Sequence, residues 1–128
     1  MAVRVLRLGS PRIAGEGTRI GTVRRPPRGV PKAEFAARNW YDVWFPELAP
    51  SLETMKLGQA ATTPQQWAAF ARKYRSEMSL PPARHAVELL AALSRQGNFS
   101  VGCYCQDEAH CHRSILRELL IEKGAEVV

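Results

Sequence analysis

Residues 99–113 read Phe-Ser-Val-Gly-Cys-Tyr-Cys-Gln-Asp-Glu-Ala-His-Cys-His-Arg, and this stretch decides how the fold is interpreted. Apolar residues alternate with small or polar ones as far as Cys105, which predicts a strand. An apolar stripe at helical spacing follows, made of Ile115, Leu116, Leu119 and Leu120. The stretch is therefore predicted to join a strand to a helix. All three cysteines and two of the three histidines lie in this junction, where parallel sheets bind their ligands.

The same patterns extend outward along the chain. Strand-like apolar runs occupy residues 3–8, 18–23 and 125–128, and helical segments are predicted over 51–57, 63–78 and 81–96. The second of these helices opens with a capping box, Thr63-Pro-Gln-Gln66. Strands that alternate with helices predict an α/β fold. We expect one domain over residues 1–128, with three layers in which helices cover both faces of a mainly parallel sheet.

Length and composition set the class of protein. The 128 residues suit one domain with one core, and the chain contains no apolar run of about 18 residues, so we expect no membrane segment. The opening Met-Ala-Val-Arg-Val-Leu-Arg-Leu is too short and too charged for a secretory signal. Three cysteines make an odd count for a disulfide framework. We therefore expect reduced thiols in a cytoplasmic protein.

The positive charge is concentrated in the first third of the chain. Residues 1–38 hold nine Lys and Arg against two acids, a net charge of +7, whereas the remaining 90 residues carry nine basic and ten acidic residues. Arg24 and Arg28 belong to a loop rich in glycine and proline. This distribution indicates an anionic partner, either a phosphate-bearing ligand or nucleic acid, although a solvated arginine-rich loop has the same composition.

The run from Trp40 to Phe45 is the densest aromatic cluster of the chain. Large apolar side chains in such a cluster are typical of core packing. The functional alternative is a wall on which a base or another ring stacks.

Cys111, His112 and Arg113 stand at the start of the predicted helix and are the candidate catalytic residues. The free N–H groups and the positive dipole end of a helix favour an anion, and arginine adds a planar fork of donors. A thiol beside such groups has a lowered pKa and is a better nucleophile. However, Cys105 and Arg113 are eight positions apart, which differs from the Cys-x5-Arg loop of phosphatases.

Two further interpretations of the junction stay open. Cys103, Cys105 and Cys111, with His110 or His112, offer the donor types of a zinc site, but their spacing differs from the usual paired Cys-x2–4-Cys, so we expect no metal. Cys103 is also typical of a small buried hydrophobic residue. The structural alternative for Arg113 is an ion pair with a carboxylate such as that of Asp42.

The chain resembles the bacterial family called domain of unknown function 488 (DUF488). The resemblance rests on Cys-x7-Cys-His-Arg at Cys103 and Cys111–Arg113, and on Arg-x-x-Pro-Arg-Gly at residues 24–29. It implies a small Rossmann-like domain without an established activity. Many relatives carry Glu where this chain has Cys105, so no role transfers from that carboxylate. A weaker similarity links the cysteine pattern to Rossmann-like domains proposed to handle nucleotide-derived ligands.

The family resemblance suggests that the basic loop and the Cys-His-Arg helix start form two walls of one pocket. We expect a phosphate-bearing, nucleotide-like molecule to bind there, held by Arg113 and the helix start with Arg24 or Arg28, and beside Cys103. The alternatives are a nucleic-acid-binding module that uses the basic third, and a thiol-dependent enzyme that uses Cys111.

Overall fold

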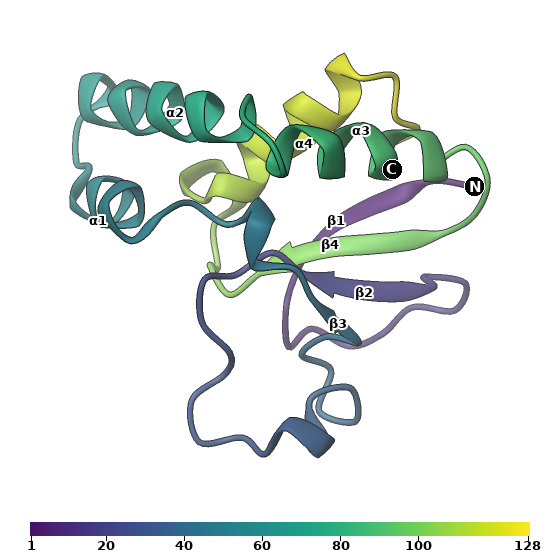
Figure 1. Ribbon diagram of the computed structural model, residues 1–128. Coiled ribbons are helices and arrows are strands. Elements are labelled where there is room, and N and C mark those ends of the chain that lie inside the picture. Colours follow the sequence, from purple (N-terminus) through teal and green to yellow (C-terminus); the bar gives the residue numbers. More distant parts are fainter.

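A four-stranded, all-parallel sheet forms the centre of the computed structural model, which describes residues 1–128 (Figure 1). The strand order is β1-β4-β2-β3. The strands are β1 (Val3–Arg7), β2 (Thr18–Gly21), β3 (Val43–Trp44) and β4 (Phe99–Cys103). Phe99 lies opposite both Val3 and Thr18, so β4 is paired on both sides. The predicted α/β fold with a parallel sheet is confirmed.

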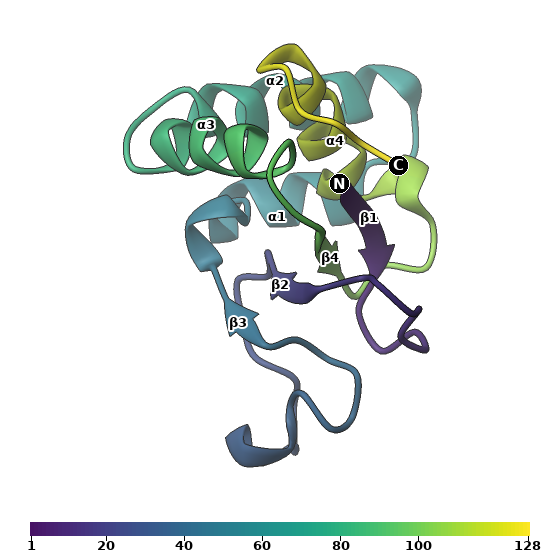
Figure 2. The same cartoon turned by 90° about the vertical axis from the view of Figure 1, so that its right-hand side faces the viewer.

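Four α-helices accompany the sheet: α1 (Leu52–Ala60), α2 (Pro64–Met78), α3 (Ala83–Leu93) and α4 (His112–Glu122). Helices α2, α3 and α4 gather on one side of the sheet, and α1 packs against α2 near the carboxyl ends of β1 and β4 (Figures 1 and 2). Three short 3-10 turns, η1 (Lys32–Glu34), η2 (Pro46–Leu48) and η3 (Glu108–His110), complete the regular structure. None of the helices is long and apolar enough to cross a bilayer.

The main core lies between the sheet and the helices. Alternate residues of β4, such as Phe99 and Val101, point toward α2, α3 and α4 because side chains of a strand alternate between its faces. Tyr74 of α2 is fully buried in this core, and its hydroxyl donates a hydrogen bond to the carbonyl oxygen of Leu48 at 2.7 Å. The helix that carries Tyr74 begins with the predicted capping box of Thr63 and Gln66. The helix predicted from the sequence of residues 63–78 is therefore present, and its apolar face packs into the core.

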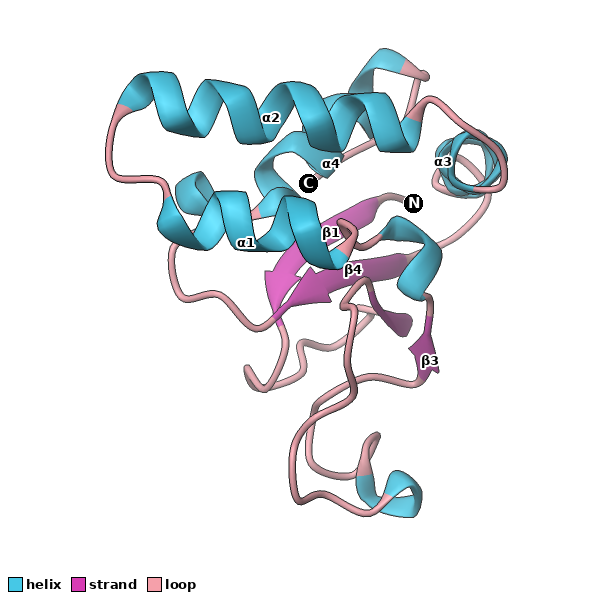
Figure 3. Ribbon diagram, turned by 60° about the vertical axis from the view of Figure 1, so that its left-hand side comes forward, coloured by secondary structure: helices cyan, strands magenta, loops and turns pink.

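The other face of the sheet is covered by loops rather than by helices (Figure 3). There the fully buried Arg19 of β2 forms two hydrogen bonds with the carboxylate of Glu16, at 2.8 and 2.9 Å. A Cβ atom on Gly21 would lie 2.4 Å from the ring of Tyr41, so only glycine lets this ring lie against β2. The structure therefore differs from the expected three layers in one respect: a buried ion pair and an aromatic loop, and not helices, form the third layer.

The last apolar residues do not form a full strand. Val127 makes an isolated parallel bridge with Val3, and the amide of Val128 donates to the carbonyl oxygen of Val3 at 3.0 Å. Both termini consequently lie at the same end of the sheet, opposite its carboxyl edge (Figure 1). The functional candidates all lie at that carboxyl edge.

Candidate functional site

Two cavities open at the carboxyl edge of the sheet, and Arg25 and Tyr104 line both of them. The larger one, the arginine cavity, has a volume of about 760 Å³. Its walls come from the end of β1 with the loop after it, from the basic loop after β2, and from Trp40 before β3 and Tyr104 after β4; the arginines among them are Arg7, Arg25 and Arg28. The smaller one, the thiol cavity, has a volume of about 280 Å³ and is lined by Arg24, Trp67, Phe70, Cys103, Cys105, Cys111 and His112, among others.

Tyr104 is the partition between the cavities, and its position is fixed at both ends. Its hydroxyl donates to the carbonyl oxygen of Arg25 at 2.9 Å, while its own carbonyl oxygen accepts from Nε of Arg7 at 3.2 Å. The ring packs edge-on against Trp40, with 5.7 Å between centroids. Trp40 comes this close to the β1 loop because Gly9 has φ +92° and no side chain in its way.

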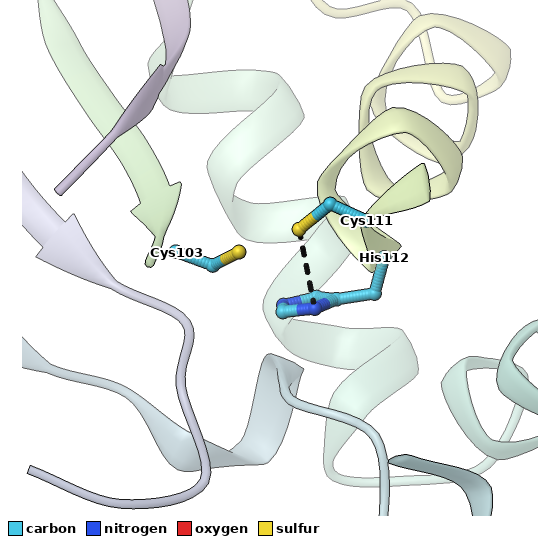
Figure 4. Close-up of side chains that lie close together, drawn as sticks. All are labelled: Cys103, Cys111 and His112. Carbon is cyan, nitrogen blue, oxygen red and sulfur yellow. Dashed lines mark hydrogen bonds between the residues drawn. The ribbon is translucent and has the colours of Figure 1, made fainter. Parts of the chain in front are cut away.

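The thiol cavity contains a compact cluster of donor atoms (Figure 4). Cys103 ends β4, Cys111 is the N-cap of α4, and His112 is the first residue of that helix. One donor atom from each of these three residues lies within 4.8 Å of the others. The Sγ atom of Cys111 is 3.8 Å from Nδ1 of His112. The cluster is buried, whereas Cys105, two residues beyond Cys103, is exposed.

The tautomer of His112 follows from its backbone contact. Its Nε2 atom lies 2.7 Å from the carbonyl oxygen of Thr22, which can only accept, so Nε2 carries the proton. The lone pair of Nδ1 then faces the sulfur of Cys111. Burial lowers the pKa of His112 to about 4, so the imidazole is neutral at pH 7.

The three neighbouring thiols titrate together. Hydrogen bonds from the thiols of Cys103 and Cys111 lower the pKa of Cys105. The contact with Cys105 raises the pKa of Cys103, and contacts with both other thiols, together with burial, raise the pKa of Cys111. Of the three thiols, that of the exposed Cys105 therefore loses its proton most readily.

Arg113 and Arg24, which were expected to hold a phosphate at the helix start, instead donate to backbone carbonyl groups. Arg113 is only 3% exposed and lines neither cavity; its Nη2 donates to the carbonyl oxygens of Cys105 and Gln106 at 2.8 and 3.4 Å. Asp42 instead pairs with Arg12, at 3.0 Å. Arg24 lines the thiol cavity but donates to the carbonyl oxygens of Pro46, Ala49 and Pro50, each at 3.1 Å.

Of the expected arginines, only Arg28 has an uncommitted guanidinium in a cavity wall, and that wall belongs to the arginine cavity. The sequence analysis did not identify Arg7, the last residue of β1, or Arg25, which lies beside Arg24. Trp40 belongs to the aromatic run of residues 40–45 and lines the arginine cavity. The position of Arg7 could have identified it, because a residue at the carboxyl end of a parallel strand lies where such sheets bind ligands.

These geometries allow two kinds of chemistry. The arginine cavity is lined by cations and aromatic rings, which suit an anionic, flat ligand. The thiol cavity presents two sulfurs and an imidazole nitrogen that can share a metal ion. The lowered pKa expected for the Cys111 thiol is not found: its pKa is raised, and the lowered pKa of His112 makes that imidazole a weak base.

The parallel sheet, with its polar and thiol groups gathered at the carboxyl edge, defines a small α/β domain of the kind that carries its chemistry on strand-to-helix loops. A family model described as the active DUF488-N3 subclade matches residues 3–124, so this chain is a member of the DUF488 family, whose function is uncharacterised. No curated protein and no solved structure matches the chain.

Proposed function

We propose that the protein binds a phosphate-bearing, nucleotide-like small molecule in the arginine cavity. The observation that carries the proposal is the composition of the cavity wall, which holds three arginines and no acidic residue. Arg25 and Arg28 make no ion pair, and Arg7 uses only its Nε atom internally. Several guanidinium N–H groups are therefore free to bind a dianion.

Two aromatic rings support a nucleotide rather than a bare ion. Trp40 and Tyr104 are half-buried in the cavity wall, and their perpendicular packing holds both rings in place. A base or a similar flat group gains about 1–3 kcal/mol by stacking on such a ring. The cavity volume of about 760 Å³ falls within the range of small-molecule sites.

Arg24 contributes to this site indirectly, as a positioning residue. Its guanidinium ties the start of the basic loop to three carbonyl oxygens of the segment from Pro46 to Pro50. Pro26 and Pro27 then restrict the backbone before Arg28. The Arg-x-x-Pro-Arg-Gly motif thus combines an anchor, a stiff spacer and a free guanidinium.

The test compares the melting temperatures of wild type, an Arg25→Ala/Arg28→Ala double variant and Arg72→Ala. Arg72 is the matched control because it is exposed on α2, away from both cavities. The panel contains nucleoside mono-, di- and triphosphates, sugar phosphates and inorganic phosphate. We expect a phosphate-bearing compound to stabilise wild type and Arg72→Ala but not the double variant. No stabilisation by any compound, or equal stabilisation of all three proteins, contradicts the proposal.

Nucleic acid is the competing ligand class. Binding by oligonucleotides alone, with an affinity that falls steeply with salt because counterions are released, would assign the basic surface to a polymer instead. A thiol-dependent reaction at Cys111 would instead lose its activity in Cys111→Ser while the phosphate response stays intact.

A further inference from the structure

We propose that the thiol cavity contains a site for one thiophilic divalent cation such as Zn²⁺, with Cys103, Cys105, Cys111 and His112 as its four ligands. This site is independent of the arginine cavity and does not rest on ligand binding there. On sequence spacing alone we expected no metal; the folded arrangement leads to the opposite inference.

The distances between the donor atoms fit a tetrahedral ion. Ligands at about 2.3 Å for sulfur and about 2.0 Å for nitrogen place a sulfur and a nitrogen about 3.5 Å apart in a tetrahedron. Sγ of Cys111 and Nδ1 of His112 are separated by 3.8 Å. With Cys103, all three donor atoms lie within 4.8 Å of one another, so small side-chain movements bring them onto one ion.

His112 has the surroundings of a metal ligand. Its Nε2–H is held by the carbonyl oxygen of Thr22 at 2.7 Å, which leaves the lone pair of Nδ1 directed at the sulfurs. Metal-binding histidines nearly always donate their second ring N–H to a carbonyl or carboxylate in this way. The contact is buried, so it fixes both the tautomer and the ring orientation before an ion arrives.

Cys105 supplies the fourth donor from the loop after β4. Its backbone N–H donates to Sγ of Cys103 at 3.4 Å, and Cys105 lines the same cavity as the other three ligands. Arg113 donates to the carbonyl oxygen of Cys105 at 2.8 Å and so fixes the backbone of this loop. The Cys-His-Arg motif is then explained as two ligands followed by a positioning residue for a third.

The charges of such a site balance locally. Each thiol loses its proton to solvent when it coordinates, so three thiolates and a divalent cation leave a net charge of −1. The buried guanidinium of Arg113 lies beside the loop that carries Cys105 and offsets this charge. The N-terminal dipole of α4, at which Cys111 stands, acts in the same direction.

The test uses the full chain, freed of metal with a chelator under a non-coordinating reductant, and titrated with Co²⁺ as a spectroscopic substitute for Zn²⁺. We expect saturation at one ion per chain, with thiolate-to-cobalt charge-transfer bands and the strong visible bands of a tetrahedral site. Cys111→Ser and His112→Ala should each weaken binding at least about 100-fold, since even indirect contacts are worth 10–100-fold. Weak, six-coordinate spectra in wild type overturn the proposal.

His110→Ala tests the alternative histidine ligand, because His110 also lines the thiol cavity but is exposed and pairs with Asp107 at 2.9 Å. Unchanged Co²⁺ binding in this variant is expected; loss there, with binding retained in His112→Ala, contradicts the site. Variants of buried cysteines can unfold, so a second measurement uses wild type only. One equivalent of Zn²⁺ should protect Cys103, Cys105 and Cys111 together from alkylation, and unprotected thiols overturn the proposal.

Discussion

Arg113 donates a hydrogen bond from Nη2 to the carbonyl oxygen of Cys105 at 2.8 Å, and thereby closes the loop between β4 and α4. The side chain is 3% exposed, and its Nε atom has no partner. Arginine was expected there as an anion clamp, but its donors face inward onto the loop backbone. The residue therefore shapes the site rather than contacting a ligand in the arginine cavity.

Replacing Arg113 with alanine should destabilise the protein while sparing the arginine cavity. We expect the free energy of unfolding to fall by about 2–4 kcal/mol, because the buried carbonyl oxygens of Cys105 and Gln106 lose their donor. Urea denaturation of the variant and of the exposed-site control Arg72→Ala measures this. If the variant has wild-type stability but no longer responds to phosphate compounds, Arg113 binds the phosphate at the helix start and this prediction is wrong.

The Glu16–Arg19 pair should make the loop-covered face of the sheet sensitive to acid. The hydrogen bond from Arg19 holds the pKa of Glu16 below its usual value of 4.5. A lowered pKa means that the pair stabilises the fold above the unfolded pKa, and that this contribution is lost as pH falls through the folded pKa. Glu16→Gln should cost about 3–5 kcal/mol at pH 7, since it leaves Arg19 buried without its charge partner.

The pH series for this pair is a comparison of urea denaturation between wild type and Glu16→Gln. The difference in free energy of unfolding should shrink as pH is lowered below 4.5, because wild type then loses the same charge. A difference that stays constant down to acid-induced unfolding would mean that Glu16 carries no linked proton.

Gly21→Ala should lower the free energy of unfolding more than Gly97→Ala does. A Cβ atom at Gly21 would lie 2.4 Å from the buried ring of Tyr41, whereas a Cβ atom at Gly97 has no neighbour within 4 Å. We expect a loss of about 1–3 kcal/mol for the first variant, typical of overpacking, and almost none for the second. Thermal melts of both variants check this, and equal melting temperatures would show that Tyr41 moves aside freely.

The sequence predicted those parts of the fold that depend on local pattern. Alternation along 99–103, helical stripes and the Thr63–Gln66 capping box are one-dimensional signals, and the elements they predicted are present. The layer on the second face was not predicted, because Glu16 and Tyr41, which lie against Arg19 and Gly21 of β2, belong to loops without a periodic pattern. Helices on both faces were the default expectation for a parallel sheet.

The candidate site was predicted in place but not in its internal arrangement. The cysteine and histidine cluster pointed to the carboxyl edge of β4, yet the sequence does not reveal where a guanidinium points. Arg113 and Arg24 satisfy backbone carbonyl groups, whereas the neighbouring Arg25 faces a cavity. The direction of each guanidinium group is set by tertiary hydrogen bonds, which cannot be predicted from the residue type alone.

The most direct test of the arginine cavity uses the fluorescence of Trp40. In a Trp44→Phe/Trp67→Phe background, Trp40 is the only tryptophan left, since the chain has three. The protein is titrated with nucleoside monophosphates and with the matching nucleosides. We predict saturable quenching by a monophosphate, and binding about 10–100-fold weaker for its nucleoside and for Arg28→Ala, because charge-assisted hydrogen bonds are lost. Emission that is unchanged by every monophosphate, or quenched equally by nucleoside and monophosphate, would contradict a phosphate site in this cavity.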